Sequence, residues 1–395
     1  DGMLSYRYLF DIALILLSTK VLGIVTKKFQ MPQVVGALLA GLILGPAVFN
    51  IITETDFIKQ IAELGVIVIM FTAGLSTDIN ELKSTGKASF IIALCGVILP
   101  LIGGTAVAYI FNRGELAGVY GNEFIENIFI GIILTATSVS ITVETLKELG
   151  KLNTKTGNAI LGAALIDDIL GIIALTIVTS FNDASVSVIL VLMKIILFFI
   201  LSGISGYLFY KCFDKFVNRY DSDMRRFIIA AFVFCLLLSF AAERFFGVAD
   251  ITGAFIAGLV LSNNKETSYI NTRFETLSYM LLSPIFFASI GLKVSLSKMS
   301  SGIILFTICI VGIGIITKII GCGLGAKLCR FNNKEALQVG IGMVARGEVA
   351  LVVANKGISM GIMNPVFLAP IIILVVVCAI ATPIILKIVY KEKNI

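Results

Sequence analysis

Long apolar runs, separated by short polar breaks, occupy almost the whole chain. A run of about 20 apolar residues is long enough to cross the hydrocarbon core of a membrane as a helix. Dividing the sequence at its polar breaks predicts an all-α polytopic membrane protein with thirteen transmembrane helices. Their ranges are 8–26, 33–50, 59–77, 88–111, 127–146, 157–180, 188–210, 227–246, 249–262, 277–296, 302–326, 335–356 and 364–390. These spans leave no room for a soluble catalytic domain.

The basic residues of the predicted loops indicate an orientation. On an alternating path of thirteen spans, 20 Lys and Arg residues fall on the side of the C-terminus and 7 on the other side. Cytoplasmic loops carry the excess of positive charge. We therefore expect a multi-pass protein of the cytoplasmic (inner) membrane with its N-terminus outside and its C-terminus in the cytoplasm. The net charge of +6 is assigned to these loops, and no nucleic-acid partner is expected.

Composition agrees with a membrane protein and limits the chemistry. Of the 395 residues, 58% are apolar and only 14% are charged. The chain has no histidine, so proton transfer near neutral pH has to use carboxylates or lysines. Its seven cysteines include no CxxC pair and are interpreted as buried thiols, not as metal ligands or disulfides.

A weak internal repeat relates two parts of the chain. The segment 36–44 resembles 253–261 at an offset of 217 residues, and Gly74-Leu75 recurs as Gly291-Leu292 at the same offset. The matching spans are an odd number of spans apart, so the two copies face opposite ways. This predicts six spans, a connecting helix at 188–210, and six inverted spans, an arrangement typical of secondary transporters.

Three ionisable residues lie deep inside predicted spans. Asp167 and Asp168 stand near the centre of the sixth span, where each acidic residue costs several kcal/mol and is functional by default. Lys318 lies deep in the eleventh span and needs a carboxylate partner, for which either aspartate is a candidate. A purely structural ion pair is the alternative. Lys20 and Lys194 lie nearer to span ends, and both are predicted to snorkel to the membrane surface.

Polar residues interrupt two further spans. The fifth contains Thr135-Ala-Thr-Ser, and the twelfth contains Arg346-Gly-Glu. An ordinary helix with back-bonded hydroxyls is one interpretation of the first motif. Because both motifs fall in equivalent helices of the repeat, we instead predict two discontinuous helices that cross near the membrane centre. Glu348 and Arg346 are then placed to neutralise the dipoles of the half-helix ends.

Four motifs together resemble the bacterial monovalent cation:proton antiporters of the NapA and GerN type. They are Thr135-Ala-Thr-Ser, Leu165-Ile-Asp-Asp-Ile-Leu-Gly-Ile-Ile-Ala-Leu, Thr317-Lys-Ile-Ile-Gly, and Met343-Val-Ala-Arg-Gly-Glu-Val-Ala-Leu. The resemblance implies a transporter, not an enzyme. It implies that Asp168 is the carboxylate that binds the metal cation and the proton, and that Asp167 is the partner of Lys318. It also implies that Thr137 and Ser138 lie beside this site.

The resemblance further implies a core transport domain and a separate dimerisation domain. The predicted ranges of the dimerisation domain are 1–83 and 227–299, and those of the core are 84–187 and 300–395. A linker helix at 188–226 joins the two halves. The expected partners are membrane lipid and a second copy of the chain in a homodimer.

The expected activity is exchange of Na⁺ or Li⁺ for H⁺, with a role in pH homeostasis and no cofactor besides the transported ions. By resemblance, exchange is electrogenic, with two protons per sodium ion. A K⁺/H⁺ antiporter of the same family and a sodium-coupled symporter are the alternatives. The related potassium efflux branch has Gln-Asp and a nucleotide-binding tail where this chain has Asp167-Asp168 and no such tail, which favours sodium. An ion channel fits less well because channels use repeated rings of ligands. An intramembrane aspartyl protease also fits less well, because it needs two carboxylates on separate helices and Asp167 and Asp168 are adjacent on one helix.

Overall fold

The structure is a computed structural model that describes residues 6–29, 31–113, 122–219, 224–295 and 300–391, without the side chains of residues 348, 352 and 359. Within these ranges the regular structure is entirely helical. The helices are α1 (Arg7–Lys28), α2 (Gln33–Leu44), α3 (Asp56–Leu75), α4 (Ile79–Ser84), α5 (Gly86–Phe111), α6 (Glu123–Thr135), α7 (Val139–Glu148), α8 (Lys155–Asn182), α9 (Val188–Arg219), α10 (Arg225–Phe246), α11 (Asp250–Leu261), α12 (Thr267–Leu277), the π-helix η2 (Ser278–Leu282), α13 (Ser283–Leu292), α14 (Ser301–Leu328), α15 (Asn333–Gly342), α16 (Glu348–Ser359), the 3₁₀-helix η3 (Pro365–Phe367) and α17 (Leu368–Val389).

The helices confirm a polytopic membrane protein. Among the described residues, ten helical segments are long and apolar enough to cross a membrane. In this count α6 and α7 form one segment, α12, η2 and α13 form another, and η3 is joined to α17. Three further apolar helices are shorter: α2, α11 and residues 349–358 of α16. They belong to the second, ninth and twelfth predicted spans. Every predicted span therefore coincides with helical structure, while the number of thirteen crossings stays a prediction.

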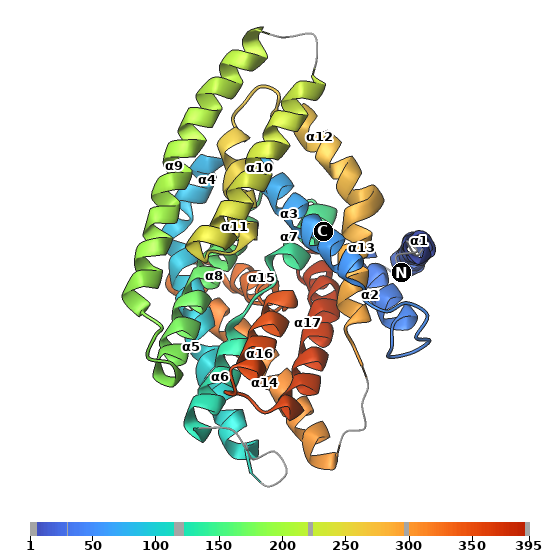
Figure 1. Cartoon of the computed structure of the whole chain (residues 1–395), viewed down its shortest axis with the longest axis vertical. Helices are drawn as coiled ribbons and strands as arrows, with labels where there is room; N and C mark the ends of the chain where they lie inside the picture. Colours follow the sequence, from blue (N-terminus) through green and yellow to red (C-terminus); the bar gives the residue numbers. More distant parts are fainter. Residues whose placement is uncertain (1–5, 30, 114–121, 220–223, 296–299, 392–395) are drawn as a thin grey trace, which may run out of the picture.

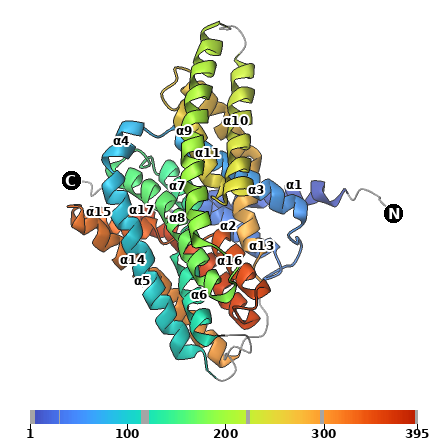
Figure 2. The same ribbon diagram turned by 60° about the vertical axis from the view of Figure 1, so that its left-hand side comes forward.

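Two groups of helices pack within the molecule. Helices α1, α2 and α3 pack with α10, α11 and α13, and we call this set the panel. Helices α5, α6 and α8 pack with α14, α15 and α17, and we call this set, together with α7 and α16, the core. In Figure 1 the panel lies mainly above and to the right of the core. The long helix α9 contacts α8, α10 and α11, and it runs along the outside of the molecule in Figure 2. The short helix α4 contacts α5 and α8.

Glycines bring panel helices into backbone contact. A side-chain carbon on Gly41 of α2 would clash with the carbonyl group of Ala288 on α13, and Gly291 of α13 is equally close to α2. Gly258 of α11 and Gly74 of α3 make the same kind of contact. These glycines pair at the offset of 217 residues, 41 with 258 and 74 with 291, so the two contacts are equivalent in sequence. This equivalence agrees with the predicted repeat, which stays a prediction.

Replacing Gly258 by Val is expected to reduce the yield of folded protein and lower its melting temperature. The new side chain meets the backbone of α3 at Phe71, and overpacking of this kind costs about 1–3 kcal/mol. Size-exclusion profiles and thermal melts in detergent measure the effect. The matched control is Gly203→Val on α9, where a side-chain carbon meets no atom within 4 Å. Equal melting of the two variants contradicts the prediction.

Candidate functional site

Two interrupted helices meet inside the core. Helix α6 ends at Thr135 and α7 begins at Val139, while α15 ends at Gly342 and α16 begins at Glu348. The N–H of Ser138 donates to the carbonyl oxygen of Ala345 at 2.6 Å, so the two unwound segments touch. The predicted interruption of both helices is therefore confirmed. We call this contact the crossing.

Hydroxyl groups satisfy the backbone that the interruptions leave unpaired. Thr142 donates to the carbonyl oxygen of Gly342 at 2.7 Å, and Thr137 donates to that of Met343 at 3.3 Å. These carbonyl groups lie at the end of α15, where a helix has no partners of its own for them. Ser138 lies at the same place, but its side-chain oxygen is 3.3 Å from that of Ser140, and its backbone N–H contacts Ala345 in the segment after α15.

Arg346 lies between the C-terminal ends of the two half-helices. Its side chain is fully buried. The guanidinium donates to the carbonyl oxygen of Leu134 at 2.7 and 3.1 Å and to that of Val344 at 3.1 Å, at the ends of α6 and α15. Helix C-termini carry partial negative charge, so a cation here stabilises both ends. The Arg346 guanidinium thus contacts the ends of both half-helices, and its role in charge compensation stays a prediction. The Glu348 side chain is outside the described residues.

Asp167 and Lys318 form a buried ion pair. Helix α8 is capped by Thr154, which accepts from the N–H of Gly157, and it carries Asp167 near its middle. Lys318 comes from α14, and its Nζ donates to Asp167 Oδ2 at 3.1 Å. The side chains of Lys318 and Asp167 are 0% and 1% exposed. Breaking a buried pair by removing one partner costs about 3–5 kcal/mol. Of the two aspartates, the structure therefore brings Asp167 to Lys318.

The aspartate pair has two carboxylate oxygens without a hydrogen-bond donor among the described residues. Asp167 Oδ1 and Asp168 Oδ2 are buried and accept no hydrogen bond from the described residues. Adjacent helical residues point about 100° apart, so Asp168 does not share the contact to Lys318. The Thr137 side chain lies next to Asp167. Buried acceptors without donors require an explanation such as a bound proton or ion. The two aspartates and the Thr137 hydroxyl together form a site that is rich in oxygen atoms but offers few side-chain ligands.

The site has few protein ligands. In the part of the chain that the structure describes, no group of three or more His, Cys, Asp and Glu side chains is arranged to hold a metal ion. A bound cation would therefore depend on carboxylate, hydroxyl and backbone oxygens, which are the ligands of hard cations.

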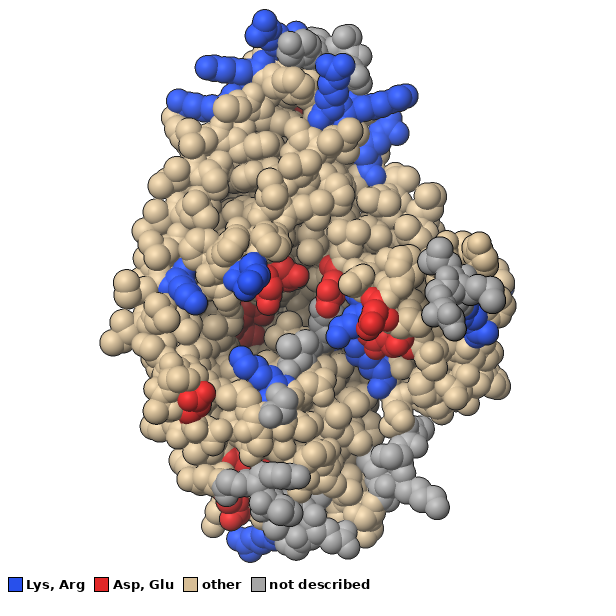
Figure 3. Space-filling model, in the orientation of Figure 1, with Lys and Arg blue, Asp and Glu red and all other residues tan. Residues whose placement is uncertain are grey.

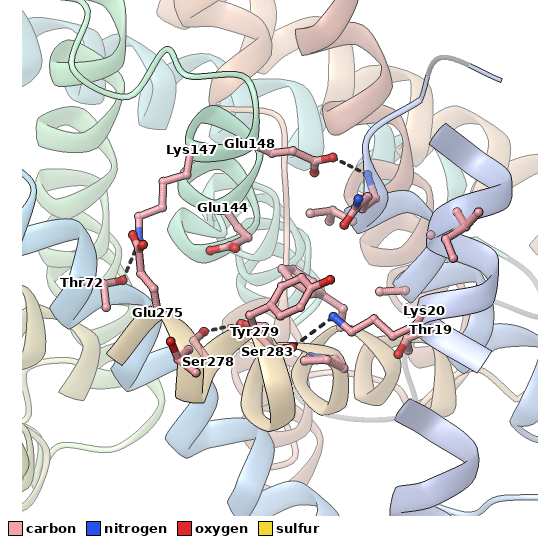
Figure 4. Close-up of a pocket in the computed structure, with 18 of the residues that line it drawn as sticks. Thr19, Lys20, Thr72, Glu144, Lys147, Glu148, Glu275, Ser278, Tyr279 and Ser283 are labelled. Carbon is pink, nitrogen blue, oxygen red and sulfur yellow. Dashed lines mark hydrogen bonds and ion pairs between the residues drawn. The ribbon is translucent and has the colours of Figure 1, made fainter. Parts of the chain in front are cut away.

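A second polar cluster lines a pocket between the core and the panel. The pocket has a volume of about 730 Å³ and lies among α1, α2, α3, α7, α12 and α13. Figure 3 shows a hollow with acidic and basic side chains around it, and Figure 4 labels residues of the pocket. Its ionisable groups are Lys20, Glu144, Lys147, Glu148, Glu275 and Tyr279. The sequence did not indicate this cluster because its members lie near span ends, where polar residues are common.

Lys20, which is predicted to snorkel to the membrane surface, contacts Tyr279 in the pocket. Its ammonium donates to the carbonyl oxygen of Tyr279 at 3.1 Å and lies 3.4 Å from the centre of the Tyr279 ring. Tyr279 belongs to the π-helical turn η2, a wide turn that disturbs the regular backbone bonding. A partner from a distant helix therefore holds the ammonium in the pocket, and its position relative to the membrane surface stays a prediction. Lys194 is exposed on α9.

Comparison with known proteins agrees with this geometry. The profile of the family described as "Sodium/hydrogen exchanger, transmembrane" matches residues 13–392. The Na(+)/H(+)-K(+) antiporter GerN of Bacillus cereus is 35% identical, covering 99% of this chain and 98% of that protein. The Na(+)/H(+) antiporter of Enterococcus hirae is also 35% identical, over 95% of this chain and 96% of that protein. The sodium proton antiporter MjNhaP1 of Methanocaldococcus jannaschii shares the fold, with a TM-score of 0.70, 19% identity, and coverage of 96% and 95%.

Proposed function

Because this chain belongs to the sodium/hydrogen exchanger family, we propose that it is a secondary active transporter that exchanges Na⁺, or Li⁺, for H⁺. The names of its relatives support this ion pair, since GerN and the Enterococcus hirae protein are both named as Na⁺/H⁺ antiporters. The proposed location is the cytoplasmic membrane, with the N-terminus outside, the C-terminus in the cytoplasm, and two copies forming a homodimer.

One observation carries the proposal: Asp167 Oδ1 and Asp168 Oδ2, beside the crossing, are buried and have no hydrogen-bond donor among the described residues. Burial without a partner favours the neutral form of a carboxyl group, and a cation at the same oxygens favours the charged form. A proton and a sodium ion therefore compete for Asp168. Competition for one site is sufficient for coupled exchange, because the site releases a proton when it takes a sodium ion.

Lys318 determines the charge that moves in each cycle. Sodium binding at the aspartates weakens the attraction between Asp167 and Lys318, which lie 3.1 Å apart. If the pair opens and the ammonium loses its proton, a second proton leaves for each sodium ion. We propose electrogenic exchange of two protons per sodium ion on this basis.

Alternating access requires the site to face each side of the membrane in turn. We propose that the core, which carries the crossing and the aspartates, moves relative to the panel. The pocket between α7 and the panel supports this, because it is a polar space on one side of the boundary between the two groups. Basic loop residues indicate that this is the cytoplasmic side.

A proton-flux assay in proteoliposomes with Na⁺, Li⁺ and K⁺ in turn tests the proposal. The expected result is proton movement driven by Na⁺ and Li⁺. The name of GerN includes potassium, so a K⁺/H⁺ antiporter is the second candidate, and proton movement driven by K⁺ alone favours it. Sodium uptake that depends on an organic solute and moves no protons overturns both and supports a symporter.

A further inference from the structure

The end of α7 is bound to two panel helices, α2 and α3, and to the neighbouring helix α12. Lys147 Nζ donates to Thr72 Oγ1 on α3 at 2.5 Å and lies 4.0 Å from Glu275 Oε1 on α12. Glu148, the next residue, accepts the N–H of Gln33 at the start of α2 at 2.8 Å. Figure 4 shows these contacts on opposite sides of the pocket, with the side chain of Glu144 between them. The last turn of α7 therefore spans the pocket from wall to wall.

The contacts differ in strength. The Lys147 side chain is 16% exposed, whereas that of Glu275 is 52% exposed. A charged hydrogen bond that is largely shielded from water is stronger than an exposed ion pair. The bond between Lys147 and Thr72 is therefore the main attachment, and Glu275 contributes less. Glu148 adds a bond to the first turn of α2, where the backbone N–H groups have no partners within the helix.

The other end of α7 belongs to the crossing. Thr142 bonds to the end of α15, and Ser138, which precedes α7, bonds to Ala345. Helix α7 has ten residues and is about 15 Å long. A helix this short behaves as a rigid rod, so the panel contacts at one end also hold the crossing at the other. Any movement of the core past the panel has to break them.

We propose that Lys147 and Glu148 form a latch that holds α7, and with it the crossing, against α2 and α3 while the pocket is open. Each transport cycle then breaks and reforms this latch. The inference rests on the proposed alternation of the core between two positions. A weaker latch lowers the population of the pocket-open state, and an ion that enters through the pocket then binds with lower apparent affinity. Apparent affinity from the opposite side rises or stays the same.

Sided transport kinetics of Lys147→Met and Thr72→Val test the latch. In proteoliposomes of known orientation, Lys147→Met should raise the KM for Na⁺ on the pocket side relative to the opposite side by about tenfold, the size expected for one charged hydrogen bond. Thr72→Val retains the charge and should shift the ratio in the same direction. The double variant should add little to Lys147→Met, since both changes remove one bond. Lys28→Met, an exposed lysine at the end of α1, is the control.

Hydrogen exchange measures the latch without transport. In the described residues the N–H of Gln33 donates to Glu148, so Lys147→Met should speed exchange in a peptide covering the start of α2, measured without sodium. Unchanged exchange overturns the latch. If hydrogen exchange is faster but the ratio of the KM values on the two sides is unchanged, the proposed link between the latch and transport is overturned. If the unmutated protein moves no protons in response to sodium, the proposed function fails, and the exchange result alone then decides whether the latch exists.

Discussion

Replacing Asp168 by Asn is expected to reduce sodium-dependent proton movement to the level of protein-free liposomes. The amide has nearly the shape of the carboxyl group, so the packing of α8 persists. It cannot release a proton near neutral pH, and it offers a cation no negative charge. The variant can therefore neither release a proton at this position nor bind a sodium ion there. The assay is the fluorescence of a pH dye inside the vesicles after a sodium pulse.

The melting temperature separates loss of function from loss of structure. A ligand present at 100 times its Kd stabilises the folded state by about 2.7 kcal/mol. Sodium should therefore raise the melting temperature of the unmutated protein and have no such effect on Asp168→Asn. Without sodium, the variant should melt no lower than the unmutated protein, because Asp168 Oδ2 accepts no hydrogen bond from the described residues. An inactive variant that also unfolds early would not support the assigned role.

Asp183→Asn provides the matched control on the same helix. Asp183 follows the last residue of α8 and is exposed. Hydrogen bonds from the backbone and then the side chain of Ser185 lower its pKa, so this carboxylate stays charged at neutral pH. Removing its charge should leave transport unchanged. Retained sodium/proton exchange in Asp168→Asn, with Asp183→Asn also active, contradicts the proposed site.

The positions of the buried charges could be predicted from the sequence alone. Asp167, Asp168 and Lys318 stand out because charged residues are rare in apolar runs. Spacing alone left open which aspartate contacts Lys318, and only the resemblance favoured Asp167. The answer depends on how α8 and α14 rotate about their axes, which a hydropathy pattern does not encode. The interruptions were also visible, because hydroxyl and glycine residues replace apolar ones there.

The pocket cluster could not be predicted in the same way. Lys20, Glu144 and Glu275 come from α1, α7 and α12, which are far apart in the sequence. Each lies near a span end, where a charged residue usually reaches water and carries little information. Their meeting depends on the packing of the core against the panel. The π-helical turn at Tyr279, whose carbonyl group binds Lys20, has no signal in the sequence that we recognise.

Replacing Lys318 by Gln is expected to leave exchange active but remove its net charge movement. The amide can still donate a hydrogen bond to Asp167, yet it carries no proton to release when sodium binds. Only the proton of Asp168 then exchanges, one for each sodium ion. The measurement is the current from a layer of proteoliposomes after a sodium step, alongside proton flux with and without a clamped potential. The current should fall to background while the flux persists and no longer depends on the potential.

The double variant Asp167→Asn/Lys318→Gln separates charge from stability in this prediction. Lys318→Gln alone leaves a charged aspartate buried without its cation, which should destabilise the protein by up to about 3–5 kcal/mol. In the double variant both partners are neutral and the hydrogen bond remains possible, so the melting temperature should recover. Ion exchange by the double variant should also move no net charge, because Asp168 is then the one of the three residues that can still bind and release a proton. If the current of either variant equals that of the unmutated protein, the second proton does not pass through Lys318.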